Sequence, residues 1–119
     1  MTPEELKART KRFALRVLKV ADALPRKPSG RTCASQIADS GTSVASNYRA
    51  ACKARSRREF IAKLGVAEEE ADETQLWLEL IMESGLVPPR RLQSLYQEAC
   101  EITAILAASR KSASGRDAK

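Results

Sequence analysis

Five apolar residues near the C-terminal end of the sequence recur with spacings of 3, 4, 3 and 4. They are Leu92, Leu95, Ala99, Ile102 and Leu106. This spacing puts the five side chains on one face of an α-helix, and it is typical of helices that pack with a left-handed crossing. Because such a face must be covered by other helices, the rest of the chain has to supply them.

Three further helices are expected before this one. The first begins at residues 2–5, where Thr, Pro and Glu form a capping signal, and it ends at the two prolines and the glycine of residues 25–30. The second covers residues 31–52. Its many Ser, Thr, Gly and Ala residues are mediocre helix formers or small, so close packing against a neighbour has to hold it.

The third helix is expected from residue 57, because Ser56 and Glu59 form a second capping box directly before an apolar run. Gly85 and the prolines at 88–89 end it. These breaks predict an all-α, up-down-up-down four-helix bundle over residues 1–109. Residues 110–119, which are small, polar and basic, are expected to form a disordered tail.

The composition limits the surroundings and the chemistry of the protein. No apolar run approaches the roughly 18 residues of a membrane span, and the charged start lacks the apolar core of a secretory signal. The three cysteines form no C-x-x-C pair, which is typical of reduced thiols in the cytoplasm. We therefore expect a cytoplasmic protein without a membrane partner.

Catalytic, cofactor and metal sites are not expected. The chain of 119 residues has no histidine and no glycine-rich phosphate loop, so nucleophile–base pairs and nucleotide cofactors lack their usual residues. The acidic residues between 68 and 73 fit a solvated or inter-subunit face better than a di-iron site, which takes histidines from facing helices. The cysteines are interpreted as buried small side chains rather than nucleophiles, Cys52 included.

Charge is divided sharply along the chain. Residues 26–58 carry a net charge of +7, and residues 59–83 carry −7. Opposite blocks of this kind indicate pairing within the molecule or complementary faces in an oligomer. The basic block is densest at the predicted turn between the second and third helices, which contains Arg49, Lys53, Arg55, Arg57 and Arg58. This basic corner is a candidate contact for the backbone of RNA or DNA, and the alternative is pairing across a subunit interface.

Several stretches also resemble a known family. The segments SQI…TSVASN, SRREFIAKL and ADETQLWLEL are similar to bacterial four-helix-bundle proteins first noted as encoded in ribosomal-RNA intervening sequences, and the similarity spans residues 13–106. Where many members continue Ile-Ala-Glu-Gly after the Ser-Asn pair, this chain has Tyr48, Arg49, Ala50 and Ala51. The matching motif residues, interpreted as structural, are Ser43, Ser46, Asn47, Ser56, Glu59, Phe60 and Glu73.

The resemblance implies more than the residues alone do. Members of the family form bundles that assemble into rings of five subunits, and their cellular role is mostly undefined. A related accessory protein of diversity-generating retroelements works with nucleic acid. For Asn47, two interpretations stay open: a hydrogen-bond clamp between helices or to the following turn, or a contact to a nucleic acid.

Two functions follow as hypotheses. The first is a non-enzymatic oligomeric scaffold that presents helix surfaces to itself and to a protein partner, with Leu76, Trp77 and Leu80 as the oligomer interface. The alternative is a nucleic-acid-binding accessory protein that contacts RNA or DNA through the basic corner.

Overall fold

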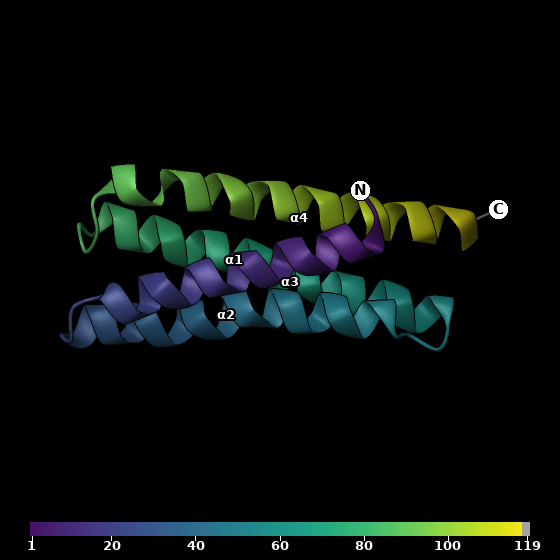
Figure 1. The fold of residues 1–119 in the computed structure, drawn as a ribbon, viewed down its shortest axis with the longest axis horizontal. Helices are drawn as coiled ribbons and strands as arrows, with labels where there is room; N and C mark the ends of the chain where they lie inside the picture. The colour runs from purple at the N-terminus through teal and green to yellow at the C-terminus, as the bar shows by residue number, and fades with distance from the viewer. Residues whose placement is uncertain (118–119) are drawn as a thin grey trace.

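Four helices make up the fold of this chain, whose computed structural model describes residues 1–117, with side chains to residue 115. They are α1 (Pro3–Ala23), α2 (Pro28–Cys52), α3 (Arg57–Glu83) and α4 (Pro89–Asp117), and they run alternately up and down a bundle of 50 × 22 × 21 Å (Figure 1). The predicted all-α bundle is confirmed, with no strand in the described residues. No helix in that part of the chain is long and apolar enough to cross a membrane.

The helix starts follow local sequence signals, with one difference. At α1, Thr2 Oγ1 accepts the Glu5 N–H at 3.1 Å and the Glu5 carboxylate accepts the Thr2 N–H, so the predicted reciprocal box is present. At α3, Ser56 Oγ accepts the Glu59 N–H, but the Glu59 carboxylate accepts the N–H of Arg55 instead of that of Ser56. The second capping box is therefore only half formed.

Helix α2 begins at Pro28, three residues earlier than expected, because proline suits the first turn of a helix as well as it ends the previous one. Gly30 lies inside this first turn and is buried. A Cβ at Gly30 would lie 1.9 Å from the carbonyl oxygen of Pro25, so only glycine lets the turn pack this closely against the preceding loop.

Helix α4 continues well past the expected end at residue 109. Ala113 is buried, and Arg110 donates from Nε to Glu68 Oε1 of α3 at 2.6 Å. These contacts hold residues 110–117 in the helix, so the prediction of a tail does not describe them. Residues 118–119 of the predicted tail lie outside the described residues.

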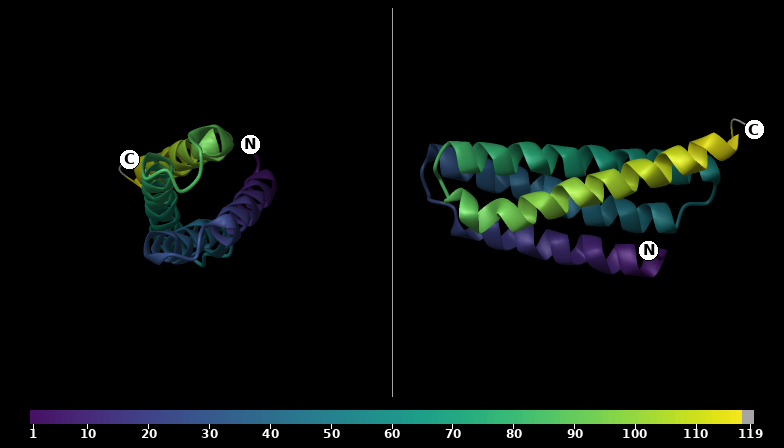
Figure 2. Two further views of the ribbon diagram at one scale, coloured as in Figure 1. Left: turned by 90° about the vertical axis from the view of Figure 1, so that its left-hand side faces the viewer. Right: turned by 90° about the horizontal axis from the view of Figure 1, so that it is seen from above.

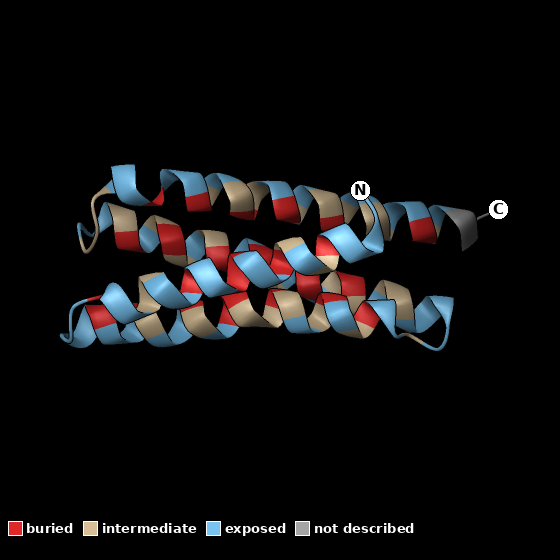
Figure 3. Cartoon of the chain, viewed as in Figure 1, coloured by how far each residue is buried: buried red, intermediate tan, exposed pale blue. Residues whose placement is uncertain are grey.

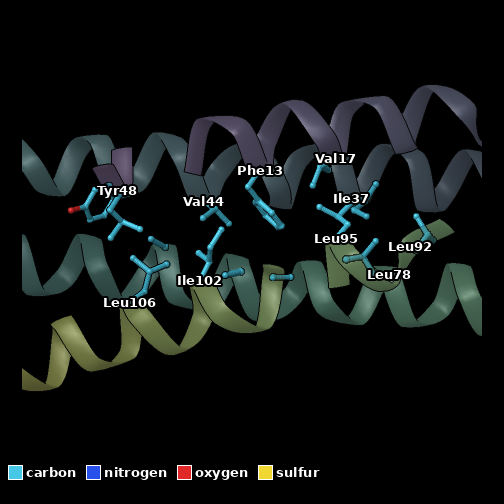
Figure 4. Packing of buried hydrophobic residues seen from close by; sticks show 14 of the residues in the cluster. Phe13, Val17, Ile37, Val44, Tyr48, Leu78, Leu92, Leu95, Ile102 and Leu106 are labelled. Atoms are coloured by element: carbon cyan, nitrogen blue, oxygen red, sulfur yellow. The ribbon is translucent and has the colours of Figure 1, made fainter. Parts of the chain in front are cut away.

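The core runs along the length of the bundle between the four inner faces (Figures 3 and 4). All five residues of the 3-4-3-4 seam in α4 are buried, as predicted. Between α1 and α2, a Cβ at Gly41 would lie 2.6 Å from Val17 Cγ1, so glycine allows the two helices to approach. The prediction that tertiary packing holds α2 agrees with this close approach.

The neighbouring helices do not pack equally. Each helix packs along the next one in sequence, whereas α1 and α4 meet at few points (Figure 2). Arg9 of α1 bridges this side through two hydrogen bonds to the Glu98 carboxylate and one to Glu101. The start of α1, the α2–α3 turn and the end of α4 lie together at one end of the bundle (Figure 1).

Candidate functional site

The predicted basic corner lies at this shared end of the bundle. Its five cationic residues are all exposed, two of them on α2 and its C-cap and three in the turn and the first turn of α3. Arg49 in the last turn of α2 is favourably placed for the helix dipole, whereas Arg57 and Arg58 begin α3, where the dipole disfavours cations. Local helix stability therefore does not account for these two arginines.

A groove between α1 and α2 adds two cations that the sequence patterns do not predict. Lys7 and Lys11 of α1 line it together with Arg49 of α2, and its volume is about 330 Å³. The spacing of Lys7 and Lys11 puts them on one face of α1. Their meeting with Arg49, however, depends on how two helices pack, which no local pattern contains.

A second hollow of about 470 Å³ lies at the same end of the bundle. Tyr48, Phe60 and Ala113 contribute apolar surface to it, and Lys7 and Cys52 are also among its lining residues. Burial and a hydrogen bond with the Cys52 thiol raise the pKa of Tyr48. The phenol is therefore neutral at physiological pH.

The cysteines differ in their surroundings. Cys33 is buried, and burial raises the pKa of its thiol; Cys100 is half-buried. Cys52 is exposed, so the interpretation of all three as buried side chains is wrong for this residue. It follows the last inward-facing residue of α2, Ala51, and the helix turns its side chain outward.

Asn47 does not clamp two helices together. Its Nδ2 donates to the carbonyl oxygen of Ser43, one turn earlier in the same helix, at 2.9 Å. Ser46 Oγ donates to the same carbonyl at 3.3 Å. The predicted bond to another helix or to the following turn is therefore wrong: a short side chain in mid-helix reaches its own preceding turn first.

The other motif residues have separate positions. Ser56 and Glu59 form the α3 cap, Phe60 is half-buried beside the core, and Glu73 is exposed. They do not converge on one point, so they do not form a site together.

The acidic residues of α3 are partly used within the bundle. Glu68 pairs with Arg110, and Glu79 accepts a hydrogen bond from the Tyr96 hydroxyl at 2.8 Å, both across the α3–α4 contact. Burial and the neighbouring Glu73 carboxylate raise the pKa of Glu70. No group of three or more metal-ligating side chains occurs among the described residues.

The predicted interface residues occupy the outer face of α3. Leu76 and Leu80 are 48% and 42% exposed. Trp77 is half-buried, and its buried indole N–H has no hydrogen-bond partner among the described residues. Val66 is also exposed, more than two turns earlier along the helix. On α1, Leu15 and Leu18 are exposed too, and the sequence does not single them out because they lie among cations.

The fold defines the class of the protein as an antiparallel four-helix bundle with one strongly basic end. A crystal structure of a protein with unknown function from the S23 ribosomal protein family of Bacteroides thetaiotaomicron VPI-5482 is similar: the TM-score is 0.86 and the identity 32%, over 93% of this chain and 99% of the other. The model of the 23S rRNA-intervening sequence protein family matches residues 5–108. The chain therefore belongs to this family, as its motifs predicted. A search of curated proteins gave no match.

Proposed function

We propose that the protein is a non-enzymatic, cytoplasmic scaffold that assembles with copies of itself and presents helix surfaces to protein partners. The observation that carries this proposal is a continuous exposed seam on α3. Its residues recur at spacings of 4, 3, 4, 3 and 4, and all are exposed: Ala62, Val66, Glu69, Glu73, Leu76 and Leu80. A seam with this period is suited to packing against another helix.

The occupant of this seam is a second copy of the chain, through its α1. Leu15 of α1 is 54% exposed and is flanked on the outer face by the exposed cations Arg12 and Lys19. Their charges are complementary to Glu69 and Glu73 in the middle of the α3 seam. Trp77 lies beside this seam, where a partner helix would complete the burial of its ring.

Contact between α1 of one copy and α3 of the next is heterologous, because two different surfaces meet. Such a contact produces a ring when the rotation between copies closes. A ring of five subunits, as the family resemblance implies, would repeat the basic end of each bundle around one rim.

The test is the molar mass in solution by light scattering in line with size exclusion. Wild type should give a multiple of the 13.1 kDa chain, and a variant with Leu76→Gln and Leu80→Gln should shift towards the monomer while its circular dichroism stays helical. Ala104→Gln with Ala108→Gln is the matched control, because both alanines are exposed on α4 at the same spacing. An unchanged mass in the α3 variant would contradict the proposal.

A second candidate function is contact with the phosphate backbone of RNA or DNA through the basic corner. The observation in its favour is the placing of exposed arginines at the start of α3, where they cost helix stability. Replacing Arg55 and Arg58 by Ser should weaken binding to a mixed-sequence duplex and reduce the slope of log K against log salt by about 2. An unchanged affinity and slope would show that the corner does not contact the nucleic acid.

A further inference from the structure

The groove between α1 and α2 has a charge of one sign. Of the seven residues that line it, Lys7, Lys11 and Arg49 are cationic, and none of these described lining residues is acidic. Lys11 and Arg49 are exposed, and Lys7 is half-buried. Lys7 forms an ion pair with Glu4 at 3.0 Å, but the Glu4 side chain is 82% exposed, so this pair is weak and easily exchanged for another anion.

The rest of the groove indicates what kind of anion it fits. Ala14 and Ala45 also line it, and their side chains are single methyl groups. The hydroxyl of Thr42 donates to the carbonyl of Ala38 at 2.7 Å, and that of Ser46 also donates to its own helix. Attraction in the groove therefore comes from the cations, and no directed donor selects a particular group.

The groove and the basic corner share Arg49, and the neighbouring end hollow shares Lys7 with the groove. Cations from α1, from the end of α2 and from the start of α3 thus follow one another across the end of the bundle. The groove residues include cations and small side chains but no aromatic ring on which a base could stack. Such a surface is suited to the phosphate backbone of a nucleic acid and not to recognition of its bases.

We propose that the α1–α2 groove binds the phosphodiester backbone of a nucleic acid, with Lys7, Lys11 and Arg49 as its phosphate contacts. This inference rests on the second candidate function and extends it from the corner to a track that includes α1. The binding is independent of base sequence and depends steeply on salt, because each contact releases a counterion.

The three like charges repel one another, and the exposed Lys7–Glu4 pair offsets little of this repulsion, so the groove is not expected to increase the stability of the bundle. This gives a readout that a structural role would not show. If the three cations serve binding, replacing them should leave the midpoint of thermal unfolding unchanged or raise it, while the affinity falls.

The experiment measures fluorescence anisotropy of labelled 20-nucleotide RNA and 20-base-pair DNA with the assembled full-length protein, from 50 to 300 mM salt. The groove variant carries Lys7→Gln, Lys11→Gln and Arg49→Gln. Its affinity near 100 mM salt should fall on the order of 100-fold, and its salt slope should fall by about 3. A control with the same loss of charge, Lys27→Gln, Arg90→Gln and Arg91→Gln, changes exposed cations at the other end of the bundle and should bind nearly as wild type does.

Two more measurements distinguish a polyanion groove from a small-phosphate site and from a subunit contact. Pyrophosphate at equal phosphate concentration should compete poorly, because it offers too few charges to span the groove; efficient competition would indicate a site for small phosphates and overturn the proposal. Light scattering on the groove variant should give the wild-type mass, and dissociation would assign the groove to the acidic seam of a neighbouring copy.

The corner and the groove can fail separately. If wild type binds neither nucleic acid, the second candidate function fails and the groove proposal fails with it. A different result would separate the two. If wild type binds and the Arg55 and Arg58 variant loses affinity while the groove variant keeps it, the second candidate function stands but the groove proposal is wrong.

Discussion

Arg9 and Glu98 join α1 to α4 by a two-pronged ion pair, with Arg9 Nε 2.8 Å from Glu98 Oε2 and Arg9 Nη2 2.7 Å from Oε1. Both side chains are less than one-fifth exposed. Because α1 and α4 otherwise meet at few points, this pair is a main connection on the open side of the bundle. Paired geometry of this kind is stronger than a single contact between exposed charges.

Replacing Arg9 by Gln should lower the free energy of unfolding at pH 7 by about 1–2 kcal/mol, because it leaves a half-buried carboxylate without its partner. The hydrogen bonds from Arg9 hold the pKa of Glu98 below its ordinary value of 4.5. The stabilisation is therefore complete above pH 4.5 and is lost as the pH falls through the lower, folded-state pKa.

Urea denaturation at pH 7 and pH 3, at one protein concentration, checks this prediction. The difference between wild type and the Arg9 variant should shrink at pH 3. Arg16→Gln is the control, since its side chain donates to the neutral Ser94 hydroxyl and its removal should cost less. An equal difference at both pH values would mean that the charge of Glu98 does not matter to the pair.

Gly41→Ala should destabilise the protein, although alanine is the better helix former. The new Cβ would meet three side-chain carbons of Val17 at 2.6–2.9 Å, and the strain of about 1–3 kcal/mol outweighs a gain of about 1 kcal/mol in helix propensity. Gly65→Ala is the matched control: its nearest new neighbour is Arg110 Cδ at 3.7 Å, so this change should stabilise α3.

A double-mutant cycle makes the test of Gly41 specific. Val17→Ala removes the carbons that clash, so Gly41→Ala should cost less in that background than in wild type. Additive effects in chemical denaturation would show that the two residues do not limit the approach of α1 to α2.

Much of the fold can be predicted from local patterns, and the errors of that prediction have physical reasons. The Thr2–Glu5 cap lies within one turn, and the α4 seam is a periodic pattern within a single helix, so both are predicted correctly from local sequence. The end of α4 depends on the burial of Ala113 and on the pairing of Arg110 with α3, which are tertiary contacts. The sequence of residues 110–119 alone resembles a tail because it is polar.

The candidate site divides in the same way. The five cations of the basic corner lie within residues 49–58, so the local charge density of the sequence is enough to find them. The groove brings Lys7 and Lys11 to Arg49 across about forty residues of chain, and its location follows from the packing of α1 on α2. The clamp interpretation of Asn47 is wrong because periodicity places a side chain on a face but does not say which carbonyl it reaches.

Ending the chain after Ser109 should lower the free energy of unfolding by about 1 kcal/mol through loss of the buried Ala113 methyl alone. It also removes the Arg110–Glu68 pair between α4 and α3. Thermal unfolding followed by circular dichroism measures the change. Lys111→Gln, an exposed change in the same segment, should stay within about 0.5 kcal/mol of wild type. An unaltered midpoint after truncation would mean that the last turns of α4 add nothing to the bundle.

The proposed α1–α3 contact predicts a rescue by exchange of charges. Arg12→Glu with Lys19→Glu should dissociate the oligomer, and so should Glu69→Lys with Glu73→Lys, because each places like charges opposite one another. Combining all four changes should restore assembly. The single tryptophan lies beside the seam, so its fluorescence maximum should shift with dissociation and follow each step. If the α1 variant and the α3 variant each dissociate and the combined variant also fails to assemble, the two sets of charges do not face each other across one contact.

The most direct test of the scaffold is the molar mass of the wild-type protein at micromolar concentration, by light scattering in line with size exclusion. The scaffold proposal predicts a single species at a whole-number multiple of 13.1 kDa, with five copies for the proposed ring. A mass of one chain would contradict it, because the exposed seam of α3 would then have no second copy to cover it.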